Sequence, residues 1–119
     1  MGARLATNHQ TTIYKICRPG EWEAAERAGV FRGSPDDHRD GFIHFSTAAQ
    51  VPGTLDRYFR GEPRLVLVAV DSNKLGPALK WESSRGGALF PHLYGVLSLD
   101  VVLWARPLAS ITDLKQLAQ

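Results

Sequence analysis

The residues that could do chemistry gather in three parts of the chain. They are Tyr14-Lys15, then Asp40-Gly41-Phe42-Ile43-His44-Phe45-Ser46-Thr47, and finally Trp81-Glu82 together with Phe90-Pro91-His92-Leu93-Tyr94-Gly95. Imidazole, ammonium, carboxylate and hydroxyl groups can transfer protons or hydrogen-bond a polar ligand. Each part therefore supplies either a share of a ligand site or polar groups that are satisfied inside the fold.

His44 and Ser46 are the candidates whose position favours ligand contact. The alternation of residues 42–46 predicts a strand in which both side chains point the same way. This strand leads into a predicted helix, whose free N-terminal amides and dipole favour an anionic ligand group. The alternative is that His44, flanked by Ile43 and Phe45, only hydrogen-bonds inside the fold.

The late part of the chain carries His92 and Tyr94. Because Pro91 and Gly95 interrupt this stretch, we expect both side chains to be displayed from a turn beside a groove. The alternative is a rigid connector in which Tyr94 packs and His92 is half exposed. Glu82, on a predicted strand, is either a solvated charge or a pocket carboxylate.

Several motifs of known chemistry are missing from the sequence. No G-x-x-x-x-G-K-[ST] or G-x-G-x-x-G pattern is present, so a phosphate loop and a dinucleotide fingerprint are unsupported. A G-x-S-x-G elbow is also missing, which argues against a serine hydrolase. The four histidines and Cys17 lack the spacing of metal ligands, and no metal site is expected.

Composition predicts one globular domain of 119 residues, 44% of them apolar and 22% charged. The net charge is +2 and no two basic residues are adjacent, so neither a nucleic-acid partner nor an anionic membrane is indicated. The longest apolar run, Leu65 to Val70, is too short to span a membrane. Cys17 is the sole cysteine, which excludes an internal disulfide and fits a cytoplasmic location. We expect it to be a small buried hydrophobe.

Periodicity predicts an α+β fold with five or six strands and two or three helices. Strands are expected at residues 12–17, 42–46, 65–70, 79–83 and 97–103, the last with Leu97, Leu99, Val101 and Leu103 inward. Helices are expected at residues 21–28, after Thr47, and briefly from Ser110. The stretch 33–41 is expected to be a surface loop.

Two details support the helix after Thr47. Thr47 and Gln50 match a capping box. Apolar side chains then recur at helical spacing, at Val51, Leu55, Tyr58 and Phe59. No boundary divides the chain, so residues 1–11 are predicted to be a flexible lead-in and residues 12–119 a single domain.

Motifs spread from about Thr12 to Val102 resemble the family called domain of unknown function 952. They are Ile13-Tyr14-Lys15-Ile16, Trp22, Asp40 to Thr47 with Gln50, Trp81-Glu82 and Phe90 to Gly95. The resemblance implies a small bacterial cytosolic protein from a family with no established activity. That family is grouped with the ADP-ribosyltransferase-like superfamily, whose members bind NAD in a cleft of a split, mostly antiparallel sheet. It thus implies that fold, with NAD or a related small nucleotide as substrate or ligand and no required cofactor.

The first two motifs of the superfamily fall on identifiable residues. The first, commonly a His on the first strand, is here Lys15, a departure from the Tyr-His-Ile that relatives often have. A lysine can still donate a hydrogen bond to a ribose hydroxyl or pair with a phosphate. The second motif falls on His44, with Ser46 and Thr47 behind it.

The third motif, often a Glu that stabilises an oxocarbenium-like ribose, has two candidates, Glu82 and the turn with His92 and Tyr94. The resemblance thus implies His44, Glu82 and His92 as catalytic residues, with Glu82 offsetting positive charge on the ribose. The implied ligand-binding residues are Tyr14, Lys15, Ser46, Thr47 and Tyr94. In that arrangement the nicotinamide stacks near Tyr14 or Tyr94, and Lys15 and His44 hold ribose or phosphate oxygens.

Two functions are compatible with these residues. One is an ADP-ribosyltransferase-like domain that acts on or binds NAD-type nucleotides. The other is a non-enzymatic module that binds a ligand or a protein. The first requires Lys15, His44 and His92 to surround one open cleft, whereas the second leaves them dispersed or satisfied in the core.

Overall fold

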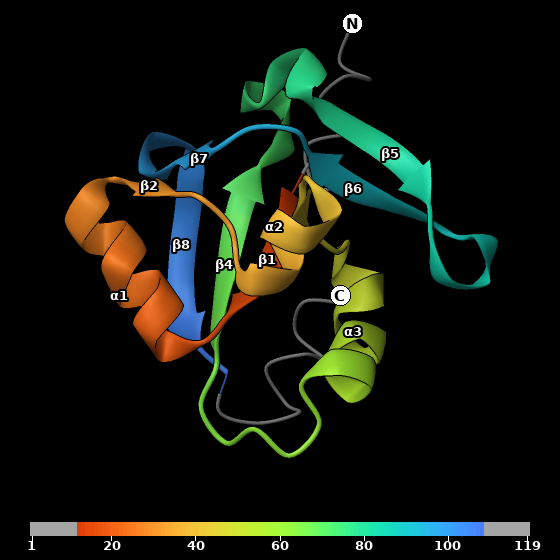
Figure 1. Cartoon of the computed structure of the whole chain (residues 1–119), viewed down its shortest axis with the longest axis horizontal. Helices are drawn as coiled ribbons and strands as arrows, with labels where there is room; N and C mark the ends of the chain where they lie inside the picture. Colours follow the sequence, from red (N-terminus) through yellow and green to blue (C-terminus); the bar gives the residue numbers. More distant parts are fainter. Residues whose placement is uncertain (1–11, 109–119) are drawn as a thin grey trace, which may run out of the picture.

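Antiparallel sheets and α-helices make up one α+β domain (Figure 1). The structure is a computed structural model that describes residues 12–108. Its strands are β1 (Thr12–Cys17), β2 (Val30–Phe31), β3 (Ile43–His44), β4 (Val66–Asp71), β5 (Leu79–Ser83), β6 (Leu89–Leu93), β7 (Leu97–Ser98) and β8 (Val102–Pro107). Its α-helices are α1 (Pro19–Ala28), α2 (Pro35–Asp40) and α3 (Val51–Tyr58).

Strand β4 is the centre of the main sheet, which has the order β1-β4-β8. It pairs antiparallel with β1 over six residues, from Thr12 opposite Asp71 to Cys17 opposite Val66. Its residues 67–70 are all buried. The strand predicted at residues 65–70 therefore forms, at Val66–Asp71, and its buried residues are typical of a strand covered on both faces.

A second sheet has the order β3-β6-β5, and an isolated bridge ties it to the main sheet. In this bridge the amide of Tyr14 donates to the carbonyl of Ser46, and the amide of Ser46 donates to the carbonyl of Tyr14, both at 2.8 Å. The two sheets are otherwise separate, and this bridge spans the split between them. A small third pair, β2 with β7, lies beside them.

The alternation of β1 places side chains in two hydrophobic clusters. Ile13 and Cys17 pack with Trp22 of α1 in one cluster. Tyr14 and Ile16 belong to the other, where α3 contributes. Lys15 lies on the same face of β1 as Ile13 and Cys17 and is itself buried.

The helices predicted at residues 21–28 and after Thr47 both form. Helix α1 begins two residues earlier than expected, at Pro19, and ends as expected at Gly29, whose φ of 78° is left-handed. Helix α3 places Leu55 and Phe59 against the second cluster, as its apolar stripe predicts. Tyr58 differs from that expectation because it is exposed.

The prediction of a surface loop at residues 33–41 is wrong, because six of these residues form α2. The hydroxyl of Ser34 accepts a hydrogen bond from the amide of Asp37, and the carboxylate of Asp37 accepts one from the amide of Ser34. Pro35 occupies the first turn and Gly41 ends the helix with a φ of 88°. Residues that favour turns thus also supply the start and stop signals of a short helix.

Three predicted segments have different bounds. The strand at 42–46 is only β3, followed by the bridge at Ser46. The expected turn at 90–95 is mostly strand β6. The strand at 97–103 is broken after Ser98, whose hydroxyl accepts from the amide of Asp100 and caps a 3-10 turn. The break changes the phase of the alternation and leaves Leu103 exposed.

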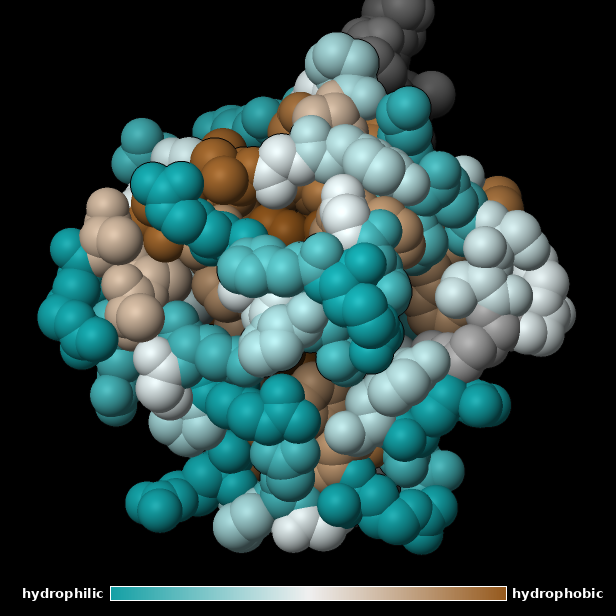
Figure 2. Space-filling model, viewed as in Figure 1, coloured by the Kyte–Doolittle hydropathy of each residue, from teal (hydrophilic) through white to brown (hydrophobic). Residues whose placement is uncertain are grey.

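Residues 1–11 and the helix predicted from Ser110 lie outside the described residues. Among residues 12–108, no helix is long and apolar enough to cross a membrane. On the face drawn in Figure 2, hydrophilic residues cover much of the surface and hydrophobic residues show mainly in the gaps between them.

The contrast between two leucines gives a test of this core. Leu97 is fully buried, whereas Leu103 is 53% exposed, although the alternation predicts that both face inward. We predict that Leu97→Ala lowers the free energy of unfolding by about 2–5 kcal/mol, because a cavity replaces the side chain. Leu103→Ala should change it by less than about 0.5 kcal/mol. Urea denaturation of both variants checks this, and similar losses in the two would contradict the assigned break.

Candidate functional site

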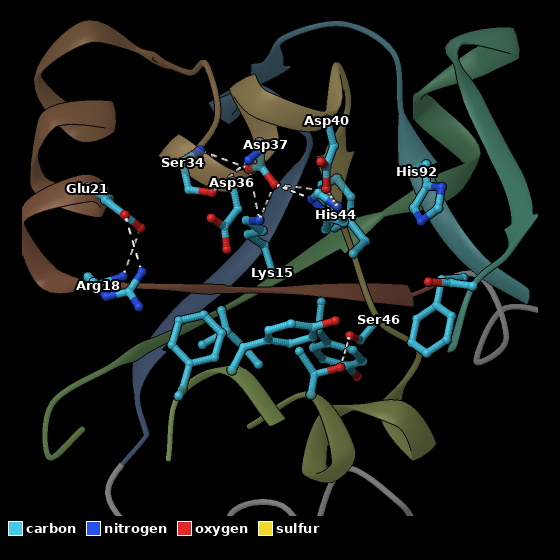
Figure 3. Close-up of a pocket in the computed structure, with 18 of the residues that line it drawn as sticks. Lys15, Arg18, Glu21, Ser34, Asp36, Asp37, Asp40, His44, Ser46 and His92 are labelled. Atoms are coloured by element: carbon cyan, nitrogen blue, oxygen red, sulfur yellow. Dashed lines mark hydrogen bonds and ion pairs between the residues drawn. The ribbon is translucent and has the colours of Figure 1, made fainter. Parts of the chain in front are cut away.

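A pocket of about 110 Å³ lies between α2 and α3, across β1 and the segment after β3 (Figure 3). Five of the eight predicted site residues line it, namely Tyr14, Lys15, His44, Ser46 and His92. The other three, Thr47, Glu82 and Tyr94, do not line this pocket. Side chains from distant parts of the chain therefore converge on one cavity.

The carboxylate of Asp37, in α2, is the centre of the polar network. It is buried, with 2% of the side chain exposed. Lys15 Nζ lies 3.0 Å from its Oδ1 and 2.9 Å from its Oδ2. The amide of Ser34 donates to Oδ2 at 2.9 Å, and His44 donates to Oδ1 through its amide at 3.1 Å and its ring Nδ1 at 2.6 Å. One carboxylate thus joins β1, β3 and the start of α2.

These donors decide the charge of Asp37. Burial alone would raise the pKa of its carboxyl group, because it penalises the charged form. The hydrogen bond from His44, the positive charge of Lys15 and the amide of Ser34 outweigh burial and hold the pKa well below its usual range. Asp37 is therefore an anion in the folded protein at neutral pH.

The ring of His44 lies between two carboxylates. Its Nδ1 faces Asp37, and its Nε2 lies 2.9 Å from Oδ2 of Asp40. Carboxylates are acceptors only, so a ring nitrogen of His44 that carries a proton donates to the carboxylate beside it. His44 lines the pocket, but both of its ring nitrogens are bonded to side chains of α2. These contacts hold α2 in place.

Ser46 offers acceptor capacity to the pocket. Its hydroxyl lies 3.0 Å from Oγ1 of Thr54, and Thr54 donates its own proton to the carbonyl of Gln50. The Ser46 hydroxyl must then be the donor between the two, which leaves lone pairs on its oxygen. Thr47 forms the predicted capping box with Gln50 instead of contacting the pocket.

A second polar group consists of His92, Glu82 and Tyr94. Oε1 of Glu82 accepts from Nδ1 of His92 at 2.7 Å and from the hydroxyl of Tyr94 at 2.8 Å. The hydrogen bond from His92, followed by that from Tyr94, lowers the pKa of the Glu82 carboxyl group. The same bond to Glu82 raises the pKa of the Tyr94 phenol. The two candidates for the third motif are therefore parts of one hydrogen-bonded unit.

His92 differs from its expected display on a turn. It lies in β6, is only 5% exposed, and stacks on Phe42 with ring centroids 4.0 Å apart and an interplanar angle of 24°. The pairing of β6 with both β3 and β5 explains its burial. Tyr94, expected to pack in the alternative interpretation, is 42% exposed.

Cys17 is a small buried hydrophobe, as predicted. Burial raises the pKa of its thiol to about 12, against the opposing effect of the Lys15 charge. The thiolate is the reactive form, so Cys17 is not suited to nucleophilic catalysis. Within residues 12–108, no group of three or more His, Cys, Asp or Glu side chains is arranged to hold a metal ion.

Sequence reasoning missed Asp37 and the role of Asp40. Both lie in the stretch taken for a surface loop, where carboxylates are ordinarily solvated. A usable signal was present, because Ser34 followed three residues later by Asp37 has the spacing of a capping box. This signal predicts a helix that begins after Ser34, but it does not predict that Asp37 pairs with Lys15.

Comparisons with known proteins identify relatives along most of the chain. A family model described as protein of unknown function (DUF952) matches residues 16–105. The X-ray structure of protein CC0527 from Caulobacter crescentus is 45% identical, with a TM-score of 0.85, and the match covers 92% of this chain and 100% of that one. The solution NMR structure of CC0527 is 50% identical, with a TM-score of 0.72 and coverage of 80% and 82%. No curated protein matches the chain.

The low pKa of Asp37 predicts how stability depends on pH. In the unfolded chain a carboxyl group titrates at about 3.9, so the stabilisation from Asp37 is complete above about pH 5 and is lost as the pH falls toward its lower folded pKa. We predict that Asp37→Asn costs about 3–5 kcal/mol at pH 7, because buried Lys15 loses its partner. The cost should shrink at pH 3. Asp36→Asn, an exposed control, should cost less than about 1 kcal/mol. Urea denaturation at both pH values measures this, and a cost of Asp37→Asn that does not depend on pH would contradict it.

Cys17 gives a test of burial. We predict that the native protein reacts with a thiol-specific disulfide reagent at neutral pH far more slowly than the urea-unfolded chain, because the thiol is both buried and protonated. The absorbance of the released thiol follows the reaction. Equal rates in the folded and unfolded protein would show that the first cluster is open to solvent.

Proposed function

The chain belongs to the DUF952 family of proteins of unknown function, and on that premise we propose that its pocket binds NAD or a related nucleotide. The proposal includes an ADP-ribosyltransferase-like arrangement of the split sheet. Binding, more than group transfer, is the function that the geometry supports best.

The convergence of predicted residues carries the proposal. Lys15, His44 and His92 come from β1, β3 and β6, and they line the same pocket. Lining of one pocket by these residues is what a nucleotide-binding function requires. Aromatic side chains of the lining, among them Tyr14 and Tyr58, could stack on a nicotinamide or an adenine.

The position of the pocket relative to the sheets gives further support. Tyr14 and Ser46 form the bridge between the two sheets and also line the pocket. The pocket therefore lies at the split, which is where the superfamily that this chain resembles binds NAD. The main sheet and the second sheet are both antiparallel, as that fold requires.

Three of the predicted residues take different roles in this proposal. Lys15 and His44 are held by Asp37, so their first effect is to shape the pocket instead of holding ligand oxygens directly. Glu82 does not line the pocket, so it is not placed to face a ribose there. For this reason we favour binding over cleavage of the glycosidic bond.

A protein-interaction role is the second candidate. The hairpin of β5 and β6 exposes Trp81 and Leu89, which are 44% and 55% exposed. Trp81 lies opposite Pro91, and Leu89 lies opposite Ser83, two positions further along the hairpin. Large apolar side chains on one exposed hairpin face are typical of contact surfaces.

Calorimetric titration with NAD, ADP-ribose and NADP tests the nucleotide proposal. We expect saturable binding of at least one of them, and we expect Tyr58→Ala to weaken it by about fivefold or more through lost stacking. Tyr58 lines the pocket yet is 51% exposed, so its replacement should leave the fold intact. Leu103→Ala, away from the pocket, is the matched control. Absence of heat from all three ligands at millimolar concentration would overturn the proposal in favour of the protein-interaction role.

A further inference from the structure

The ring of His92 has one polar atom that the fold leaves unused. Its Nδ1 is bonded to Glu82, which lies outside the pocket lining, while the ring itself lines the pocket. Figure 3 shows the His92 side chain extending from β6 on the side opposite Arg18. Among residues 12–108, Nε2 makes no hydrogen bond, and because no buried side-chain polar atom there lacks a partner, Nε2 must be accessible. His92 is only 5% exposed and lines the pocket, so the pocket is where a ligand would reach this nitrogen.

Glu82 determines which nitrogen of His92 carries the proton. A carboxylate can only accept, so the hydrogen bond to Glu82 places a proton on Nδ1. In the neutral ring, Nε2 is then the nitrogen with a lone pair, and it acts as an acceptor. The hydroxyl of Tyr94 holds the same Glu82 oxygen, and stacking on Phe42 fixes the plane of the ring.

The charged groups around the pocket are already paired. Lys15 is held by Asp37, and His44 is held by Asp37 and Asp40, all at 3.1 Å or less. Together with the acceptor oxygen of Ser46, Nε2 of His92 therefore gives the pocket lining two acceptor atoms. A hydroxyl group satisfies such a surface, whereas a phosphate oxygen, which can only accept, does not.

We propose that His92 Nε2 accepts a hydrogen bond from a sugar hydroxyl of the bound nucleotide, with Glu82 and Tyr94 as positioning residues that never touch the ligand. The inference rests on the proposed nucleotide function. It assigns a sugar hydroxyl of the ligand to the part of the pocket that His92 lines. It assigns Glu82 to orienting His92, in place of direct contact with the ribose.

The first test is the tautomer of His92 in the unliganded full chain. At pH 8, nitrogen-15 NMR should show a protonated Nδ1 and an unprotonated Nε2, with the signals assigned by their loss in His92→Gln. Glu82→Leu removes the acceptor and should convert this state to a mixture of both tautomers. A protonated Nε2 in the wild-type chain, or an unchanged tautomer in folded Glu82→Leu, would overturn the role given to Glu82.

The second test is calorimetric titration with NAD. His92→Phe keeps a flat ring on Phe42 but has no nitrogen, and it should weaken binding by about tenfold, the effect of one lost hydrogen bond of about 1.4 kcal/mol. His92→Gln, whose amide oxygen can accept, should restore the affinity to within about threefold of the wild type. His38→Phe is the control, because His38 is exposed and outside this pocket.

The outcomes separate the two proposals. If wild-type protein and folded His92→Phe bind NAD equally, the inference about His92 is wrong and the nucleotide function stands. If the wild type binds none of NAD, ADP-ribose and NADP, the proposed function is wrong and the hydroxyl contact has no ligand. Loss in His92→Phe without recovery in His92→Gln would assign the effect to packing and would also overturn the inference.

Discussion

The buried carboxylate of Asp37 is the interaction on which the site depends. It collects donors from β1, from the segment before α2 and from β3, three parts of the chain that no common strand ladder holds together. An anion with this little exposure is tolerable only when each oxygen is well bonded. The hydrogen bonds and ion pairs of Asp37 therefore fix α2 over the split between the sheets. The part of the pocket that α2 forms is held by charge pairing more than by apolar packing.

The two histidines of the pocket consequently do different work. His44 has both nitrogens bound to acidic side chains of α2, and it belongs to the framework. His92 has one nitrogen bound to Glu82 and lines the pocket, where we propose that its other nitrogen meets the ligand. The ring of His44 is thus held by two carboxylates and the ring of His92 by one.

Local patterns in the sequence were sufficient for much of the fold and for part of the site. Alternation located β1 and β5, a continuous apolar run located β4, and the capping box of Thr47 formed as expected. The resemblance to a family grouped Lys15, His44 and His92, which lie far apart in the sequence. The burial of Asp37 was not predicted, because no local pattern indicates that an acidic residue is buried. Its contact with Lys15, 22 residues away, is what explains the burial. Leu103 was wrongly predicted to face inward. The three-residue 3-10 turn after Ser98 interrupts the strand, so the alternation of inward and outward side chains does not continue across it.

The order of the strands also has a consequence for how the molecule assembles. Cys17 of β1 pairs with Val66 of β4, so the main sheet encloses a loop of about fifty residues that contains α1, α2, β3 and α3. Closing such a loop costs chain entropy before any contact across it forms, and topologies of this kind fold slowly. Most of the residues that line the pocket lie within that loop or in the strand that closes it. The pocket is therefore expected to form late in folding, after β1 has paired with β4.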